Sequence, residues 1–311
     1  MVDEGHLELL TGWNRTAPSA ATVVGVRDDA DVDALLAATG RRGLIARGLG
    51  RSYGDAAQNA GGTVLDGPSL DQIHGIDAAR GVVRVGAGVS LDDLMRAVLP
   101  VGFFVPVTPG TRFVTVGGAI AADVHGKNHH LDGSFANHVE SFTLHTPKGV
   151  VTVTPDSDPE LFWGTAGAMG LTGVVTEVVL RLLPVETSMV RSENERCGDL
   201  DTVMARMLED DEDFRYSVAW IDCLARGKSL GRSILSRGEH ATVDELPQKL
   251  RSQPLRFDPH DRLVAPRWVP NGLVNPLSIA AFNELWYRVS PALHRGGLET
   301  ISAFFHPLDG V

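Results

Sequence analysis

Residues 107–137 crowd glycines, small side chains and imidazoles into one stretch, V-T-P-G-T-R-F-V-T-V-G-G-A-I-A-A-D-V-H-G-K-N-H-H-L-D-G-S-F-A-N. Glycine and alanine let a backbone come within van der Waals distance of a ligand. His125, Lys127, His129 and His130 add proton donors, proton acceptors and positive charge beside that surface. This combination is typical of a wall built around a large flat cofactor.

A second candidate binding segment, residues 46–55, follows a strand-like run and reads A-R-G-L-G-R-S-Y-G-D. Backbone N–H groups in such a glycine-rich turn converge on phosphate oxygens. By itself, a tight turn without a ligand explains the loop about equally well. The loop lacks the third glycine of the G-x-G-x-x-G dinucleotide fingerprint, which disfavours a nicotinamide enzyme.

Two other interpretations of the first segment, close helix packing and metal binding, compete with a cofactor wall. Residues 115–122 predict a slim helix capped by Thr115, and such a face also suits close packing against another helix. His125 and His129 have the i, i+4 spacing of some zinc ligands, but Gly126 lies between them and no acidic residue completes a zinc motif. We therefore expect no metal site.

Composition excludes several classes of protein. The formal charge is 28 − 39 = −11, which disfavours nucleic-acid binding. Cys197 and Cys223 have no partner at metal-ligand spacing, so we expect two buried thiols rather than a zinc site or a disulfide. Residues 1–6 are acidic, unlike a signal peptide, and no apolar run reaches the roughly 18 residues of a membrane span. We expect a soluble protein, with membrane-surface association left open.

Periodicity and capping residues predict alternating elements around the two segments. Helices are expected at 28–39, 90–101 and 158–166, and strands at 44–46, 63–65, 82–85 and 173–183, the last ended by Pro184. A hairpin is expected at 140–153, with Phe142, Leu144, Val151 and Val153 in the core.

The pattern changes beyond Pro184. Residues 192–213 are polar and indicate a boundary followed by a helix, residues 216–221 predict a strand, and residues 245–276 predict loops. An apolar element begins at residue 301 and the sequence stops shortly after it, so we expect an incomplete second domain.

Together the two segments resemble the FAD-binding domain of the vanillyl-alcohol-oxidase superfamily. The similarity extends across essentially the whole chain to members that oxidise polyprenylphosphoryl ribose. It rests also on the motifs W-N-R-T at 13–16, P-G-T-R at 109–112, V-G-G-A-I-A at 116–121, H-G-K-N-H-H at 125–130, G-L-T-G at 170–173 and E-L-W-Y-R at 284–288.

The resemblance implies an α+β fold and a set of cofactor contacts. A two-subdomain, PCMH-type FAD-binding domain would cover residues 1–185, and a partial mixed α/β substrate domain residues 186–311. Covalent members often carry a histidine where this chain has Arg51, so the expected FAD is non-covalent. Its expected contacts are Ala46, Arg47, Gly48, Leu49, Gly50, Arg51, Ser52, Tyr53, Gly54, Asp55 and Ala56 around the pyrophosphate, with Gly110, Thr115, Val116, Gly117, Gly118, Ala122, Asp123, Val124, His125 and Val175.

The same resemblance implies a reaction. The ribose 2-hydroxyl of a polyprenylphosphoryl sugar becomes a ketone, and a partner NAD(P)H-dependent keto-reductase then completes an epimerisation to arabinose for cell-wall arabinan. The implied location is the cell envelope, on the periplasmic side. Lys127 would hold a substrate oxygen, His125 would orient it and Tyr53 would form a pocket wall. The alternative for Lys127 is a solvated loop charge.

The chain also departs from this family. Family members continue well past the H-P-L-D motif found here at 306–309, and Val218 stands where many carry a hydroxyl. Catalysis by this chain is therefore an open question. The alternatives are a related oxidase of an aldonolactone or polyol, since the pocket decides the substrate, and a truncated non-catalytic flavin-binding module.

Overall fold

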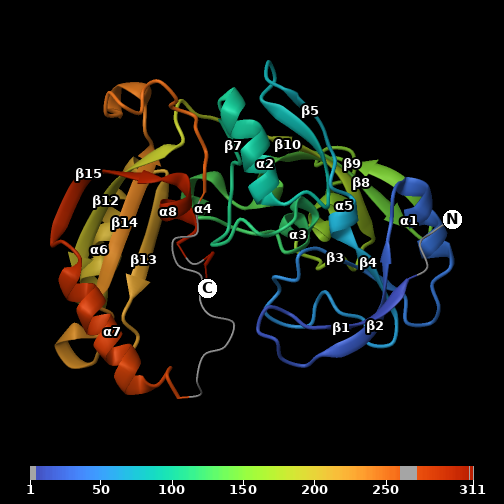
Figure 1. The fold of residues 1–311 in the computed structure, drawn as a ribbon, viewed down its shortest axis with the longest axis horizontal. Coiled ribbons are helices and arrows are strands. Elements are labelled where there is room, and N and C mark those ends of the chain that lie inside the picture. The colour runs from blue at the N-terminus through green and yellow to red at the C-terminus, as the bar shows by residue number, and fades with distance from the viewer. Residues whose placement is uncertain (1–4, 260–271, 308, 311) are drawn as a thin grey trace. The chain divides into compact units, whose positions relative to one another are not determined.

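The computed structural model describes residues 5–259, 272–307 and 309–310, and it separates into two compact units. The first unit comprises Met1–His125 and Ser134–Pro184, and the second comprises Gly126–Gly133 and Val185–Val311 (Figure 1). The sequence pattern did not indicate that residues 126–133 group with the second unit.

The first unit begins with a four-stranded sheet in the order β1-β2-β4-β3. Strands β3 and β4 run parallel, and so do β2 and β4, whereas β1 is antiparallel to β2. The Asp28 side chain caps helix α1 by accepting from the backbone N–H of Asp31 at 2.9 Å, as the predicted helix start requires. The elements are β1 (His6–Leu10), β2 (Ser19–Gly25), α1 (Asp29–Ala37), β3 (Leu44–Arg47) and β4 (Thr63–Asp66).

A second, antiparallel sheet of the first unit has the order β5-β6-β10-β8-β9. The predicted hairpin is confirmed as the pair β8 and β9. Val151 is 39% exposed, so its assignment to the core is wrong, whereas Phe142, Leu144 and Val153 are buried. The reason is that β9 is an edge strand with little to cover it. The strands are β5 (Ile73–Asp77), β6 (Val82–Gly86), β8 (Val139–Thr146), β9 (Gly149–Val153) and β10 (Val174–Arg181).

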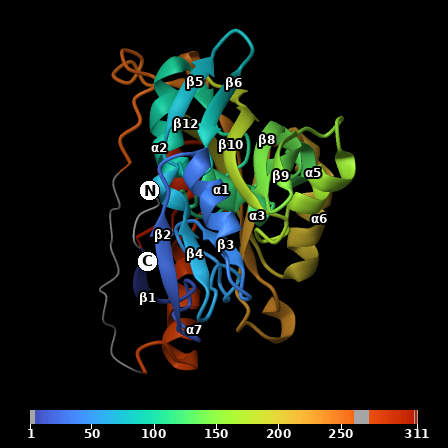
Figure 2. The same ribbon diagram turned by 90° about the vertical axis from the view of Figure 1, so that its right-hand side faces the viewer.

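Helix α1 shares one hydrophobic cluster with both sheets of the first unit. Figure 2 shows this helix among the strands of the two sheets. Val32 and Leu35 of the helix pack with Leu65 of β4 and Val174 of β10. Pro184 does not end β10, which stops at Arg181; it pairs instead with Phe103 in a short ladder. The remaining elements are η1 (Gly67–Ser69), α2 (Leu91–Val98), η2 (Leu99–Val101), β7 (Phe103–Phe104), α3 (Val116–Ala121), η3 (Phe135–His138), α5 (Pro159–Thr165) and β11 (Leu183–Pro184).

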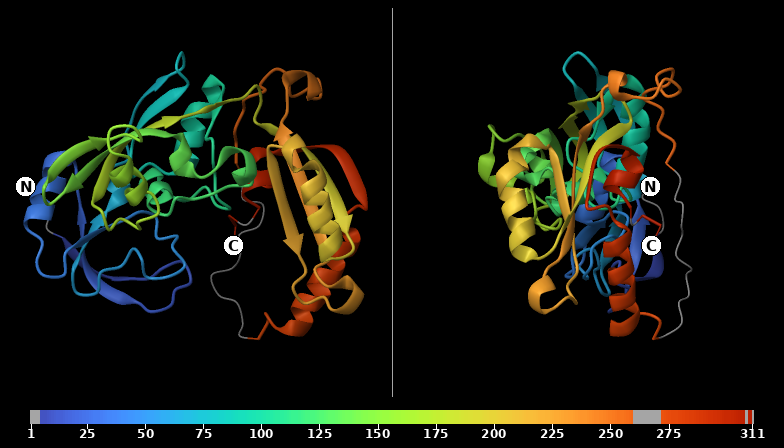
Figure 3. Two further views of the ribbon diagram at one scale, coloured as in Figure 1. Left: turned by 180° about the vertical axis from the view of Figure 1, so that it is seen from behind. Right: turned by 90° about the vertical axis from the view of Figure 1, so that its left-hand side faces the viewer.

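The second unit is built on an antiparallel sheet in the order β13-β14-β12-β15. Helix α6 lies along one face of it (Figure 3), where Val203 packs with Cys197 and Leu235. The predicted strand at 216–221 is confirmed as β13. The elements are α4 (His129–Asp132), β12 (Met189–Cys197), α6 (Leu200–Asp210), η4 (Asp211–Asp213), β13 (Tyr216–Ile221), η5 (Gly227–Ser229), β14 (Ser233–His240), η6 (Val243–Glu245), α7 (Pro276–Val289), β15 (Leu293–Thr300) and α8 (Ile301–Phe305).

Three further expectations concern this unit. Cys197 is buried but Cys223 is exposed, so the prediction of two buried thiols is wrong for Cys223. The apolar element expected from residue 301 is helix α8, while part of the predicted loop region, residues 260–271, lies outside the described residues. Across the described ranges, no helix combines the length and the apolar character needed to cross a bilayer.

Candidate functional site

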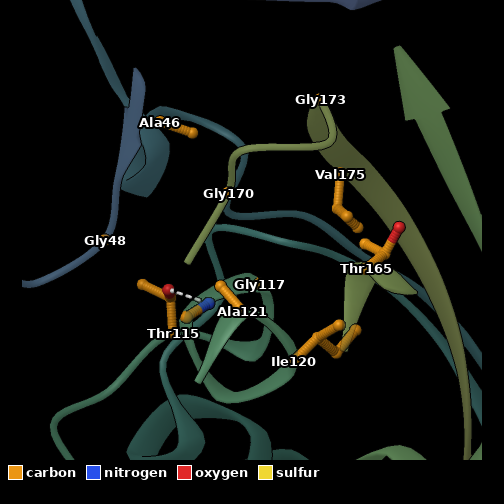
Figure 4. A pocket seen from close by; sticks show the side chains of 11 residues that line it. Ala46, Gly48, Thr115, Gly117, Ile120, Ala121, Thr165, Gly170, Gly173 and Val175 are labelled. Atoms are coloured by element: carbon orange, nitrogen blue, oxygen red, sulfur yellow. Dashed lines mark hydrogen bonds between the residues drawn. The ribbon is translucent and has the colours of Figure 1, made fainter. Parts of the chain in front are cut away.

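A pocket in the first unit is walled by small residues from four parts of the chain (Figure 4). The end of β3, the first turns of α3, the end of α5 and the start of β10 with its preceding loop meet there. Its lining consists of Ala46, Gly48, Thr115, Gly117, Gly118, Ile120, Ala121, Thr165, Gly170, Gly173 and Val175.

The N-terminus of α3 is tied into the protein. The Thr115 hydroxyl accepts from the N–H of Gly118 at 3.0 Å, confirming the predicted cap, while the N–H groups of Val116 and Gly117 donate to carbonyls of Val89 and Ala87 at 2.9 and 2.7 Å. These donors are therefore engaged within the protein. Helix α3 therefore gives the pocket a surface of small residues that a flat ring can approach. Its N-terminus is not an anion-binding site.

Backbone donors lie instead in the glycine loop. The N–H groups of residues 49–53 donate to no acceptor among the described residues. Gly50 has the positive φ of +66° that a loop of this shape requires. Successive unengaged N–H groups in a turn are a binding arrangement for phosphate oxygens.

The lead segment before β2 holds this loop in place. The N–H of Trp13 donates to the carbonyl of Ser52 at 2.8 Å, and the Arg47 guanidinium donates to the carbonyls of Thr11 and Ala57 at 2.7 and 3.1 Å. Arg47 therefore supports the loop from within the protein, because its guanidinium donates to backbone carbonyls.

Six of the predicted FAD contacts meet in this pocket, namely Ala46, Gly48, Thr115, Gly117, Gly118 and Val175. Sequence reasoning did not single out Thr165. Ile120, Ala121, Gly170 and Gly173 were visible only as parts of motifs. The φ values of +82° at Gly170 and +157° at Gly173 explain why glycine is needed at these two positions. The other predicted residues, which do not line this pocket, are Arg47, Leu49, Gly50, Arg51, Ser52, Tyr53, Gly54, Asp55, Ala56, Gly110, Val116, Ala122, Asp123, Val124 and His125.

Tyr53 is an exposed residue of the glycine loop. Its side chain is 73% exposed, and its ring meets that of Trp13 edge-to-face at a centroid distance of 5.9 Å. The structure thus puts Tyr53 at the surface of the first unit rather than in the small-residue pocket.

The pocket residues fit FAD. Thr165 is 3% exposed, and its Oγ1 has no hydrogen-bond partner among the described residues. A buried hydroxyl without a partner is costly, and a polar ligand in the pocket would relieve that cost. The slim wall suits the flat rings of the cofactor, and the loop donors suit its pyrophosphate.

Lys127 belongs to the second unit, where it is largely buried. Its Nζ donates to the carbonyl of Phe304 and lies 4.6 Å from the centroid of that ring. Burial lowers its pKa from 10.5 to about 8, against the opposing effect of the Glu299 carboxylate. Lys127 is therefore not a solvated loop charge.

His125 belongs to the first unit and is exposed, and its backbone forms a bridge with Ser134. Helix α4 begins at His129, so His125 and His129 do not share a helix. Within the described residues, no group of three or more histidine, cysteine, aspartate or glutamate side chains has the arrangement of a metal site.

Comparisons with known proteins agree with this geometry. Residues 20–154 match the family model of an FAD binding domain. Decaprenylphosphoryl-beta-D-ribose oxidase of Mycolicibacterium smegmatis is 48% identical over 306 residues, which cover 96% of this chain and 66% of that protein. An uncharacterized protein of Streptomyces coelicolor is 41% identical over 231 residues, covering 71% of this chain and 62% of that protein. The chain thus spans slightly less than two thirds of the length of these relatives.

The fold is also similar to a solved structure of alkyldihydroxyacetonephosphate synthase. The TM-score is 0.62 at 13% identity, with 73% of this chain and 48% of that chain covered. This likeness, together with the mixed helix and strand content, confirms the predicted α+β fold. Residues 20–154 therefore form an FAD-binding domain, as the two glycine-rich segments predicted, and FAD is its cofactor.

Proposed function

We propose that this protein oxidises the ribose 2-hydroxyl of decaprenylphosphoryl-β-D-ribose to the 2-keto sugar. The observation that carries the proposal is the 48% identity, over 96% of this chain, to the oxidase of M. smegmatis named for that substrate. The FAD-binding domain supports it, because oxidation of an alcohol needs an acceptor for two electrons.

Oxidation of the alcohol removes a hydride from C2 and a proton from the attached oxygen. FAD, when bound, supplies the acceptor for the hydride. Lys127 is the residue that we propose to hold the substrate oxygen. An ammonium group carries three N–H donors, and the Phe304 carbonyl takes one of them. With a pKa of about 8, Lys127 is charged at neutral pH, which strengthens its hydrogen bonds to a hydroxyl or phosphate oxygen.

His125 and Tyr53 complete the proposed set. An exposed imidazole at His125 can orient the substrate hydroxyl, and the exposed Tyr53 ring offers an apolar surface to the sugar or its lipid. FAD would be held non-covalently, because Arg51 stands where covalent members often carry a histidine.

The proposal extends to a partner and a location. The keto sugar becomes arabinose only if a second enzyme returns a hydride to the opposite face, so we propose an NAD(P)H-dependent keto-reductase as partner. The substrate's polyprenyl chain is apolar and resides in a membrane. We therefore also propose association with a membrane surface in the cell envelope, on the periplasmic side.

An anaerobic bleaching assay tests the proposed substrate. FAD-loaded protein is mixed with farnesylphosphoryl-β-D-ribose, a shorter-chain analogue, or with gluconolactone, and loss of the flavin absorbance is followed. We expect bleaching by the ribose compound only. Bleaching by the lactone alone would favour the aldonolactone or polyol oxidase, and no bleaching by either, despite bound FAD, would favour the non-catalytic module.

A further inference from the structure

The segment 126–133, which carries Lys127, is bound to the start of β13 within the second unit. The backbone N–H of Ser217 donates to the carbonyl of Lys127 at 2.8 Å. At the other end of the segment, Nε2 of His130 lies 3.0 Å from the carbonyl of Phe214. Lys127 is therefore held through its backbone by a strand of the sheet.

One ion pair joins the same two pieces of chain through side chains. Nη1 of Arg215 lies 3.1 and 3.0 Å from the two carboxylate oxygens of Asp132. Asp132 also accepts from the Asn128 amide at 2.6 Å, and the backbone N–H of Arg215 donates to the Glu239 carboxylate at 2.6 Å. The Arg215 and Asp132 side chains are only 34% and 18% exposed, so the pair is more sheltered from solvent than a typical surface salt bridge.

The backbone is conformationally permissive at both ends of this segment. Gly126 and Gly133 are its first and last residues, and Gly133 has a φ of +71°. Since glycines confer little stiffness, the segment depends on its contacts to β13 for a fixed position. The burial of the Lys127 ammonium beside Phe304 depends on that position in turn.

We propose that Asp132 and Arg215 are positioning residues, whose ion pair fixes the 126–133 segment on β13 and so holds the Lys127 ammonium beside Phe304 for a substrate oxygen. The role toward substrate rests on the proposed function, whereas the positioning of Lys127 does not. The two are tested separately.

The first test measures the titration of Lys127 without substrate. The chain has four lysines, Lys127, Lys148, Lys228 and Lys249, so reductive ¹³C-methylation gives few NMR signals, and Lys127→Arg identifies the relevant one. In the unaltered chain, we expect a midpoint of about 8. In Arg215→Met and Asp132→Asn, the midpoint should rise by about one unit or more toward 10.5, because the ammonium regains water.

The Asp132→Asn variant separates positioning from simple electrostatics. Removing a nearby negative charge would lower the pKa of a lysine if Lys127 stayed in place. If the ion pair positions Lys127, the pKa of Lys127 should instead rise in this variant. Because Asn is nearly isosteric with Asp, this variant also decides the matter if Arg215→Met fails to fold.

The chain offers a matched control in Arg206→Met. Arg206 pairs with Glu195 at 3.1 Å in the same unit, with side-chain exposures of 30% and 16%. We expect this variant to leave the Lys127 midpoint unchanged. A midpoint that stays at about 8 in both Arg215→Met and Asp132→Asn, or that falls in Asp132→Asn, would overturn the proposal.

The second test uses flavin bleaching by farnesylphosphoryl-β-D-ribose. We expect Asp132→Asn to lower kcat/KM roughly tenfold or more, with no further loss when it is added to Lys127→Ala, because both changes remove the same contact. Arg215→Lys, which keeps a cation, should retain more activity than Arg215→Met. Full additivity of Asp132→Asn and Lys127→Ala would refute action through Lys127, while the NMR titration still reports on the positioning itself.

Discussion

Gly48 should be essential to the pocket because of its close approach to the Thr115 side chain. A Cβ added at Gly48 would overlap Oγ1 of Thr115 and would lie 3.3 Å from its methyl group. That same Oγ1 caps helix α3 through the N–H of Gly118 at 3.0 Å. Gly48→Ala therefore has to displace the side chain that starts α3 and forms part of the pocket wall.

The expected cost follows from two terms. Loss of a threonine N-cap costs about 1 kcal/mol, and overpacking costs about 1–3 kcal/mol. Together they predict that Gly48→Ala lowers the stability of the first unit by roughly 2–4 kcal/mol. Its thermal midpoint should then fall by about 4–16 °C, and displacement of Thr115 should weaken FAD binding about tenfold.

Thermal melts of the apo protein and FAD titrations followed by flavin fluorescence measure both effects. Gly54→Ala is the control for stability, since it lies in the same loop and an added Cβ there meets nothing within 4 Å; it should leave the thermal midpoint unchanged. A Gly48→Ala, Thr115→Ala double variant relieves the overlap, so it should be hardly less stable than Thr115→Ala alone. Additive losses, or a Gly48→Ala variant that melts and binds like the unaltered chain, would refute the reasoning.

Three further predictions concern titratable groups. Lys127→Ala should keep FAD but lose bleaching by farnesylphosphoryl ribose; unchanged turnover would remove Lys127 from the mechanism. Because the pKa of Lys127 is about 8, its charge disappears as pH rises through 8, so the KM for this substrate should rise there, and Lys127→Arg should abolish the rise. Burial lowers the pKa of His240 to about 4, below the unfolded value of about 6.5, so the unfolded chain takes up the proton first and stability should fall as pH drops from 6.5 to 4. Urea midpoints should show a weaker dependence in His240→Gln, and equal slopes would contradict this.

Capping residues and apolar periodicity predicted much of the first unit from sequence. Asp28 and Ser90 cap helices because their side chains accept the N–H groups of Asp31 and Asp93. These interactions span only three residues, so a local pattern reveals them. The exposure of Val151 could not be predicted in this way, because it depends on β9 lying at the edge of its sheet.

Strand β12 was missed because its charges suggest a solvated region. Glu193 pairs with Arg237 at 2.5 Å and with Arg295 at 2.7 Å. These arginines lie 44 and 102 residues later in the sequence, on the two strands that flank β12 in the sheet. Only the sheet brings these charges together, and their pairing permits Arg237 to be 2% exposed. A single sequence contains no local signal for such long-range pairing.

In the candidate site, too, some residues could be predicted from a local sequence signal and others could not. Glycine and threonine types marked Gly48, Gly117 and Thr115 as wall residues, because close approach needs small side chains. Thr165 carried no signal, since its burial on the wall depends on how α5 packs. Lys127 likewise groups with the second unit, where its carbonyl accepts from the N–H of Ser217, a residue 90 positions later in the sequence.

The central claim is that the small-residue pocket and glycine loop of this chain bind FAD without a covalent bond. Purified protein is titrated with FAD, flavin fluorescence is followed, and the loaded protein is then precipitated with acid and filtered. We predict saturable binding that Gly48→Ala weakens, with all the flavin recovered in the acid supernatant. Folded protein that does not bind added FAD, or flavin that stays with the precipitate, would contradict the account.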